Sequence, residues 1–487
     1  MELYTNESIL ISRVLGHLGY GKEMVAFRHN VSKRLESVMR NMLSSEIQLH
    51  AILAGSKGEG LTAPLESDYD IMVVYSDVIC KEYLDSVTNR GEMTVFNLDM
   101  KYAAPGYTYL RAINLNDNNL TTKCLREYLA ELSPGYLYLS SDFWKHGMKK
   151  NLTQCSLLQG NQDFETVDRE NHGPSTTVTL YNTVPSDLVY AFSCECPSYL
   201  RSWSNRQRFN QWPFDGVIRE VSESESNVVP VGNIFSSMQF LEWRICFTKG
   251  EIILVQSLND CLTKCLILLK QITRIALKPL CKDMTSYIVK NVIFWIAELN
   301  DYEYFKENNL SLVLKLALLF LKQCVCRNNL PSYMIPERNL LSDRLTVDQR
   351  ANICMRIDYL LKEGPVMVYR WRKFRHAFIM LYRSPEEFYK LSKRRHLAQK
   401  LFLLKDEYSL RIITRSFSSV GELMRAVYND DLFVLLAYIS AKCIHEENNI
   451  TKDDARMFFE KKEKFISYLR DNGSRLIRNS HTNKYLA

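Results

Sequence analysis

The sequence lacks the features that mark secreted and membrane-spanning proteins. Residues 1–20 contain no apolar core behind a basic start, so we expect no signal peptide. The 13 cysteines are odd in number and irregularly spaced, which favours reduced thiols in the cytosol or nucleus over a disulfide framework. The most apolar segment, residues 310–326, contains Lys315 and Lys322 and is too short and too charged to span a bilayer. We therefore predict a cytoplasmic or nuclear protein without a transmembrane segment.

A strong charge imbalance is also missing. Hydrophobic residues make up 46% of the chain and charged residues 24%, which predicts a globular protein rather than a disordered one. The net charge of +7 is a mild basic bias that permits a polyanionic partner without requiring one. The 487 residues suffice for about two to four domains, although bilobal enzymes of this length often fold as one unit.

The stretch from Gly55 to Met72 carries the most information. A short apolar segment leads into Gly55-Ser56, and Asp68 and Asp70 stand just before the apolar run of residues 71–75, which reads as a buried strand. Residues two apart on a strand point to one face, so we expect the two carboxylates side by side. They would repel each other unless a cation lay between them, and a glycine-serine turn offers backbone N–H groups to a phosphate. The alternative is a solvated edge strand with two acids there by chance.

A third carboxylate opens a later strand. Residues 176–181 alternate like a strand, and Asp187 precedes a further apolar run after Pro185. An acid at such a place needs a partner, and a strand-end aspartate bonded to a turn is one explanation. If this strand pairs beside the first, Asp187 becomes the third ligand of one metal site. Three such carboxylates beside a glycine-serine turn are typical of nucleotidyltransferases, in which two Mg²⁺ ions act on the attacking hydroxyl and the triphosphate.

The remaining patterns predict a mixed fold. Apolar residues at a helical period over residues 22–47 predict a long helix with a buried stripe, and Lys33, Arg34 and Arg40 lie off that stripe. Residues 93–100 and 107–113 look strand-like, whereas residues 121–132 and 140–149 look helical. We expect an α+β, bilobal nucleotidyltransferase fold, with a mixed twisted β-sheet lobe, a long N-terminal helix and a helical C-terminal lobe.

Several separated motifs agree with one known family. They are Gly55-Ser56 with Asp68 and Asp70, Asp187 in Ser-Asp-Leu-Val, residues 242–247 followed by Glu251, Lys270 on a leucine-rich helix, and Ser286-Tyr287. Together they resemble the cyclic GMP-AMP synthase-like receptors (cGAS-like receptors) of the male-abnormal (Mab) nucleotidyltransferase family. The resemblance runs from about residue 22 to about residue 341 and fades beyond.

The resemblance implies roles for these residues. Asp68, Asp70 and Asp187 would be the catalytic metal ligands for Mg²⁺ or Mn²⁺. The nucleotide-binding residues would be Gly55, Ser56, Arg244, Glu251, Lys270, Ser286 and Tyr287. Structural alternatives stay open for several of them, because Trp243 and Tyr287 can be core packing, Arg244 a structural ion pair and Lys270 a lysine that snorkels to solvent.

The DNA-sensing members of this family carry a zinc-binding insertion that has no counterpart here. No histidine-cysteine cluster lies between Glu251 and Lys270, and Cys261 and Cys265 have no two further ligands nearby. We therefore expect no structural zinc, which puts duplex DNA in doubt and favours double-stranded RNA or another ligand as activator. Lys33, Arg34 and Arg40 are the candidates for that nucleic-acid surface, although a solvated basic face is the simpler reading of these charges.

The segments can be assigned in order. We expect an N-terminal helical region at residues 1–50, a nucleotidyltransferase core lobe at 51–255, a helical lobe at 256–343 and a helical extension of unknown role at 344–487. Within the extension, basic residues alternate with aromatic ones over residues 369–375. This pattern fits nucleic-acid contact and a basic helix face packed through its aromatics about equally well.

The function predicted from all this is a ligand-activated, Mg²⁺-dependent nucleotidyltransferase of innate immunity. It would join ATP and GTP, or other nucleoside triphosphates, into a cyclic dinucleotide with release of pyrophosphate. A ligand on the long helix would reshape the loop of residues 56–60 and complete the metal site. Two alternatives remain: a catalytically silent nucleic-acid-binding or scaffold member of the family, and an RNA-tailing nucleotidyltransferase.

Overall fold

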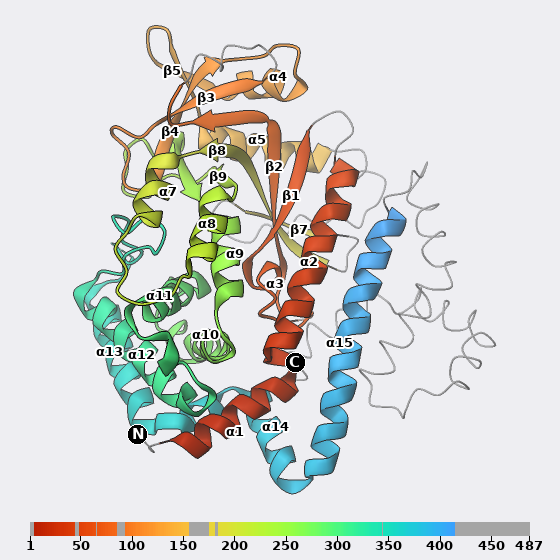
Figure 1. Cartoon of the computed structure of the whole chain (residues 1–487). Coiled ribbons are helices and arrows are strands. Elements are labelled where there is room, and N and C mark those ends of the chain that lie inside the picture. The colour runs from red at the N-terminus through yellow and green to blue at the C-terminus, as the bar shows by residue number, and fades with distance from the viewer. Residues whose placement is uncertain are drawn as a thin grey trace, which may run out of the picture. The chain divides into compact units, whose positions relative to one another are not determined.

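A computed structural model describes residues 4–43, 48–64, 66–84, 93–154, 175–180, 184–342 and 344–413 (Figure 1). The chain forms two compact units, each built from discontinuous segments. We call residues 1–26, 198–224 and 250–396 the helical unit, and residues 27–197, 225–249 and 397–487 the sheet unit. The four consecutive ranges expected from the sequence remain a prediction.

The described part of the sheet unit contains one mixed ten-stranded sheet. Its main path is β1-β2-β3-β4-β10-β9-β8-β7, and β2 also pairs with β8. The β2–β3 and β2–β8 pairs are parallel and the other pairs are antiparallel. The strands are β1 Leu49–Ala54, β2 Tyr69–Lys81, β3 Thr94–Asp99, β4 Tyr107–Asn114, β5 Leu129–Ser133, β6 Tyr136–Leu139, β7 Thr176–Leu180, β8 Val184–Glu195, β9 Ser226–Val229 and β10 Glu242–Cys246.

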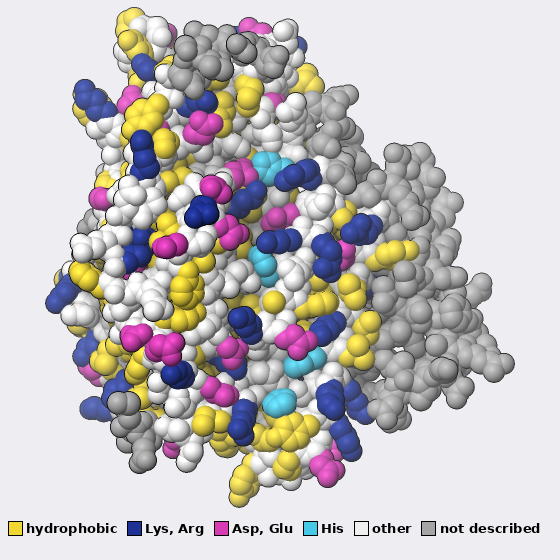
Figure 2. Space-filling view, in the orientation of Figure 1, with side chains coloured by type: hydrophobic (Ala, Val, Ile, Leu, Met, Phe, Trp, Pro, Cys, Tyr) yellow, Lys and Arg dark blue, Asp and Glu magenta, His cyan; other side chains and the backbone are white. Residues whose placement is uncertain are grey.

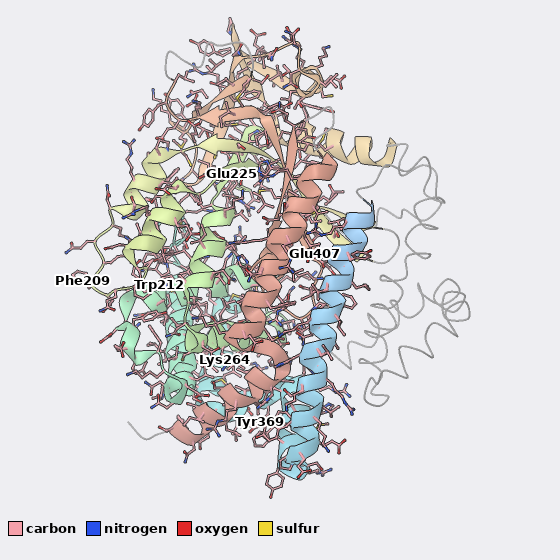
Figure 3. All side chains as sticks on the ribbon, turned by 45° about the vertical axis from the view of Figure 1, so that its right-hand side comes forward. Phe209, Trp212, Glu225, Lys264, Tyr369 and Glu407 are labelled. Carbon is pink, nitrogen blue, oxygen red and sulfur yellow. The ribbon has the colours of Figure 1, made fainter. Side chains whose placement is uncertain are left out.

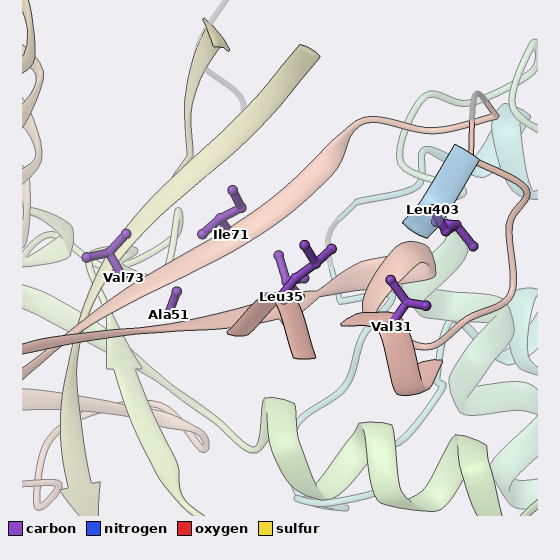
Figure 4. Packing of buried hydrophobic residues seen from close by; sticks show 7 residues of the cluster. Val31, Leu35, Ala51, Ile71, Val73 and Leu403 are labelled. Carbon is purple, nitrogen blue, oxygen red and sulfur yellow. The ribbon is translucent and has the colours of Figure 1, made fainter. Parts of the chain in front are cut away.

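The apolar run after Asp70 forms the centre of this sheet. Its side chains alternate between two core clusters, as the period of a strand requires. Ile71 and Val73 pack with Val31 and Leu35 of α2 (Lys22–Leu43) and with Leu403 of α15 (Pro385–Ile413) (Figure 4). Met72 and Val74 pack on the other face with Ile52, Ala191 and Val229. The buried strand predicted from the sequence is therefore confirmed.

The long helix also forms as predicted, with a defined start. Gly21 adopts an extended backbone (φ −78°, ψ 159°), which separates α2 from α1 (Thr5–Leu15) and the π-helical turn Gly16–Tyr20. Val31, Leu35 and Val38 of the expected stripe are buried. The side chain of Met42 and residue Ile47, which also belong to the expected stripe, lie outside the described residues.

One predicted helix is partly wrong. Residues 121–132 were expected to be helical, but α4 covers only Leu120–Arg126 and the chain then forms β5. The strand β5 pairs with β6 across a turn at Gly135, whose φ of +81° suits glycine. Pairing with β6 therefore overrides the helical pattern. The next predicted helix is present as α5, Ser141–Gln154.

The helical unit is a set of packed helices, and buried apolar residues of α10, α11 and α12 form much of its core. Besides α1 it contains α8 Asp215–Glu223, α9 Thr248–Ser257, α10 Asp260–Ile272, α11 Ser286–Leu299, α12 Leu310–Arg327, α13 Val347–Glu363 and α14 Arg372–Arg383, together with α7 Pro197–Ser204, which begins one residue before it, and the start of α15. The unit boundary at residue 396 falls inside α15. The chain is thus an α+β protein of the expected class.

One helical stretch of the described residues, Glu307–Arg327, is long and apolar enough to cross a membrane by length and composition alone. A bent pair, Thr248–Ser257 with Asp260–Leu277, passes the same test if it is counted as one span. Half of the first stretch is buried within the structure. Leu319 is 44% exposed, whereas Val313, Leu314 and Leu318 have at most 1% of their surface exposed. This burial is what a core helix of a folded domain shows.

Candidate active site

Two of the three predicted acids lie on neighbouring strands in matching register. Asp70 on β2 is the direct partner of Asp187 on β8 in a parallel pair. Residues paired in this way project from the same face of a sheet. Asp68 stands two residues before Asp70, immediately ahead of the first residue of β2. Asp68 and Asp70 are exposed, whereas Asp187 is half-buried.

The glycine of the Gly-Ser turn packs directly against one of these acids. Gly55 has a φ of +60°, which L side chains rarely adopt. A Cβ added there would lie 2.8 Å from the carboxylate carbon of Asp70 and closer still to its oxygen. Backbone angle and space therefore both require glycine at this position. Ser56 follows within the short helix α3, Gly55–Gly58, so the turn and the acids occupy one place in the sheet unit.

Three side chains of α2 hold the loop that follows the turn. The Nδ1 atom of His29 donates to the Gly58 carbonyl at 2.8 Å, and Arg28 Nε donates to the Gly60 carbonyl at 2.8 Å. The Ser32 hydroxyl contacts the Lys57 carbonyl at 3.1 Å. Burial lowers the pKa of His29, although the hydrogen bond to the Gly58 carbonyl acts in the opposite direction. Positions 28, 29 and 32 lie on one side of a helix, but no other sequence pattern predicts that these residues bind the loop.

A half-buried lysine lies next to the acids. Lys57 Nζ donates to the Pro64 carbonyl at 2.8 Å and stands 3.6 Å from the centre of the Tyr69 ring. Burial lowers the pKa of Lys57 to about 8, although the charges of Asp406, Asp68 and Asp70 act in the opposite direction. Burial also raises the pKa of Tyr69, whose hydroxyl is hydrogen-bonded to Asp406. Neither Lys57 nor Asp406 was predicted from the sequence, because Asp406 lies on α15, far from Lys57 along the chain.

The donor atoms present fit a hard cation. Carboxylate oxygens are the ligands that Mg²⁺ prefers, and it is often held by one or two carboxylates together with phosphates of the substrate. Asp70 and Asp187 supply such a pair. Within the described ranges, however, no three histidine, cysteine, aspartate or glutamate side chains stand close enough together to hold a metal ion. The two acids paired on β2 and β8 are therefore the centre of the candidate site.

The central strand β10 positions Arg244 between two neighbours. Arg244 pairs with Tyr107 of β4 and Val229 of β9 and is half-buried. The residue before it, Trp243, is completely buried and donates its indole N–H to the Leu139 carbonyl at 2.9 Å. Its interpretation as a core residue is confirmed. Arg244 stays a predicted nucleotide ligand.

The remaining candidates belong to the helical unit. Glu251 on α9 accepts a hydrogen bond from the Tyr287 hydroxyl at 2.9 Å and an ion pair from Lys290 Nζ at 2.8 Å. Lys290 is buried and was missed by the sequence analysis, although it stands three residues after Tyr287 on α11. Ser286 begins α11 and is exposed. Lys270, near the end of α10, is half-buried.

The basic face proposed for α2 is partly occupied. Arg34 Nε contacts a Glu407 carboxylate oxygen at 2.8 Å, and the same carboxylate pairs with Arg411. Figure 3 labels Glu407 on α15. Lys33 and Arg40 are exposed. Figure 2 shows Lys and Arg side chains mixed with Asp and Glu over the surface where α2 and α15 run. This surface carries both signs of charge.

The cysteines on α10 are inaccessible. Cys261 and Cys265 are both buried, and burial raises the pKa of Cys261 to about 12 and the pKa of Cys265 as well. The expected absence of structural zinc stays a prediction.

The mixed helix and sheet structure is consistent with an α+β nucleotidyltransferase-like fold. Residues 261–359 match the family model described as the Mab-21 protein HhH/H2TH-like domain. This match, which covers α10 to the middle of α13, supports the Mab-21 family, which includes nucleotidyltransferases. A comparison with curated proteins finds no match.

Proposed function

We propose that the protein is a metal-dependent nucleotidyltransferase that joins two nucleoside triphosphates into a cyclic dinucleotide and releases pyrophosphate. The observation that carries this proposal is the register of Asp70 with Asp187 on adjacent parallel strands. The Mab-21 match supports the same class of chemistry. ATP and GTP are the first substrates to test.

Asp70 and Asp187 would hold the catalytic ions, with Asp68 as the third ligand. Bound Mg²⁺ or Mn²⁺ would activate the attacking hydroxyl of the substrate and neutralise charge on the triphosphate. The backbone of Gly55 and Ser56 would bind phosphate oxygens, because glycine leaves the approach to Asp70 clear. Burial lowers the pKa of Lys57 to about 8, so the ammonium group would be mainly charged at neutral pH beside these acids.

The other candidates would bind the nucleotides themselves. Arg244 is proposed to contact one nucleotide from β10. On the helical unit, Lys270 and Ser286 would contact phosphate, and the Tyr287 ring would stack on a base. Glu251 and Lys290 support this role, because the bond from the Tyr287 hydroxyl to Glu251 fixes the orientation of the ring.

Double-stranded RNA is the proposed activator, with Lys33 and Arg40 as its contacts on α2. The contacts of α2 with the loop support a switch of this kind. Arg28, His29 and Ser32 bind three carbonyls between Lys57 and Gly60. A displacement of α2 would therefore move the loop directly after Ser56. We propose that the protein acts in this way as an innate immune receptor in the cytoplasm.

The test is a product assay with the purified full-length chain. Labelled ATP and GTP are incubated with Mg²⁺ or Mn²⁺ and with double-stranded RNA, double-stranded DNA or no nucleic acid, and products resistant to phosphatase are separated. We expect a cyclic product with the wild type. The Asp70→Asn and Asp187→Asn variants should each form about a hundred-fold less product, because each substitution removes a metal ligand. Glu195→Gln, at the opposite end of β8, is the matched control. Product from Asp70→Asn at the wild-type rate would refute the mechanism.

A silent scaffold role is the second candidate. It is favoured by one observation, that Asp68, Asp70 and Asp187 do not stand together as a ready three-ligand cluster among the described residues. Absence of product under every condition above, combined with retained nucleic-acid binding, would support it. Extension of an RNA primer in place of cyclisation would identify the RNA-tailing alternative.

A further inference from the structure

Two helices of the helical unit face each other through a pair of cysteines. The Sγ atoms of Cys326 on α12 and Cys354 on α13 are 3.0 Å apart. One helical turn away, Lys322 Nζ contacts the Asp358 carboxylate at 2.7 Å between the same two helices. Lys322 precedes Cys326 by four residues and Asp358 follows Cys354 by four. The two contacts are therefore successive rungs between antiparallel helix faces, and both helices hold the thiols in place.

This pair combines closeness with access to solvent. Cys326 is exposed and Cys354 is half-buried. Cys194 and Cys196 are also neighbours, with Sγ atoms 4.0 Å apart, but both are buried. Cys324 stands two residues before Cys326 on α12 and is buried. Exposure and proximity thus coincide at Cys326 and Cys354 within the described part of the chain.

We propose that Cys326 and Cys354 form a redox-controlled modification site, at which a low-molecular-weight disulfide such as oxidised glutathione converts the two thiols into a reversible disulfide between α12 and α13. Both cysteines lie inside the segment that matches the Mab-21 domain. The inference does not depend on the proposed nucleotidyltransferase activity.

The reaction proceeds by two thiol-disulfide exchanges. The Cys326 thiolate attacks one sulfur of oxidised glutathione, the small disulfide bond breaks, and one glutathione leaves as its thiolate. Cys354 then gives its proton to solvent, its sulfur attacks Cys326, and the second glutathione leaves. Two protein thiols are oxidised and one small disulfide is reduced to two thiols. A reduced glutathione pool reverses both steps.

Accessibility assigns the order of the two steps. Burial, together with the hydrogen bond and charge of Cys326, raises the pKa of Cys354 to about 12, whereas the charge of Lys322 lowers it. Cys354 is therefore a poor first nucleophile. Once Cys326 carries glutathione, it has no thiolate charge to oppose the ionisation of Cys354. Cys354, beside Lys322, then acts as the resolving thiol.

The test uses peptide mapping of the full-length protein after equilibration in glutathione buffers of increasing oxidised fraction. After alkylation and trypsin cleavage, Cys326 is in the peptide of residues 323–327 and Cys354 in the peptide of residues 351–356. We expect these peptides to become linked, with a mass about 2 Da below the sum of the two thiol peptides. The linked form should also unfold at a higher temperature than the reduced form, because the bridge restricts the unfolded chain.

Matched variants assign the bond. Cys324→Ser, in the same peptide but buried, should retain the link, whereas Cys326→Ser should abolish it. Cys354→Ser should leave Cys326 as a mixed disulfide with glutathione. Cys124, exposed on α4, reports whether the oxidant has reacted. Absence of the link at an oxidised fraction that modifies Cys124, or its persistence in Cys326→Ser, would overturn the proposal. Equal unfolding temperatures of the reduced variants exclude misfolding as the cause.

Discussion

The carboxylate of Asp70 lies where a side chain at Gly55 would have to stand. Ala54 is the register partner of Asp70, so the chain turns into Gly55 directly beside this acid. The positive φ of Gly55 is a second constraint at the same residue. Any side chain here must displace the acid that is paired with Asp187, and the turn and the metal ligands are therefore one structural unit.

Gly55→Ala should abolish activity and also destabilise the fold. The added Cβ collides with the Asp70 carboxylate, and the left-handed backbone adds about 1–2 kcal/mol of strain. Product formation and the free energy of unfolding in urea measure the two effects. Gly135→Ala is the matched control, because Gly135 has a φ of +81° but open space around a Cβ. Equal activity in the two variants would show that the contact with Asp70 does not matter.

Helix α15 is expected to be a necessary part of the sheet unit. Leu403 is buried against Val31 and Leu35 of α2, and Arg28 Nη1 donates to Gln399 Oε1 at 2.9 Å. Leu403→Ala should therefore lower the free energy of unfolding by about 2–4 kcal/mol. The neighbouring Leu404, which is 38% exposed, provides the control. Leu404→Ala should change the free energy of unfolding by less than about 1 kcal/mol. Similar urea midpoints for both variants would contradict this packing.

Local patterns were sufficient for the parts of the fold that depend on one segment. The run after Asp70 and the stripe on α2 were predicted because their periods report burial directly. Residues 127–132 were mispredicted, because their strand depends on pairing with β6, which a local helical pattern does not reveal. For the same reason Lys57 was missed, since its environment is completed by Asp406 more than three hundred residues away. Contacts between distant segments are thus what the sequence left undetermined.

Lys33, Arg34 and Arg40 on α2 should differ in their effect on RNA binding. Lys33 and Arg40 are exposed, whereas Arg34 is paired with Glu407. Lys33→Ala and Arg40→Ala should each weaken RNA binding and reduce its dependence on salt, because a phosphate contact is lost. Arg34→Ala should have a smaller effect on both RNA affinity and its salt dependence. Binding isotherms at several salt concentrations test this order, and a dominant effect of Arg34→Ala would contradict it.

Glu225 should make stability depend on acid pH. Figure 3 labels Glu225 in the sheet unit. Burial would raise the pKa of Glu225, but hydrogen bonds from His50 Nε2 at 3.0 Å and Lys249 Nζ at 2.7 Å outweigh it and lower the pKa from 4.5 to about 2. A carboxyl whose folded pKa is lowered stabilises the fold above its unfolded pKa, and this contribution is lost as the pH falls through the folded value.

The comparison is therefore between wild type and Glu225→Gln as the pH is lowered. The variant should be less stable by about 1–3 kcal/mol at pH 7, because the half-buried Lys249 and His50 lose a charged partner. The difference should stay constant down to about pH 5 and shrink between about pH 4.5 and 2, where only the wild type loses a charge that its fold favours. Urea unfolding at each pH measures it. Glu223→Gln, at an exposed glutamate two residues earlier, is the control. A difference that does not change with pH would show that Glu225 acts through packing and not through its charge.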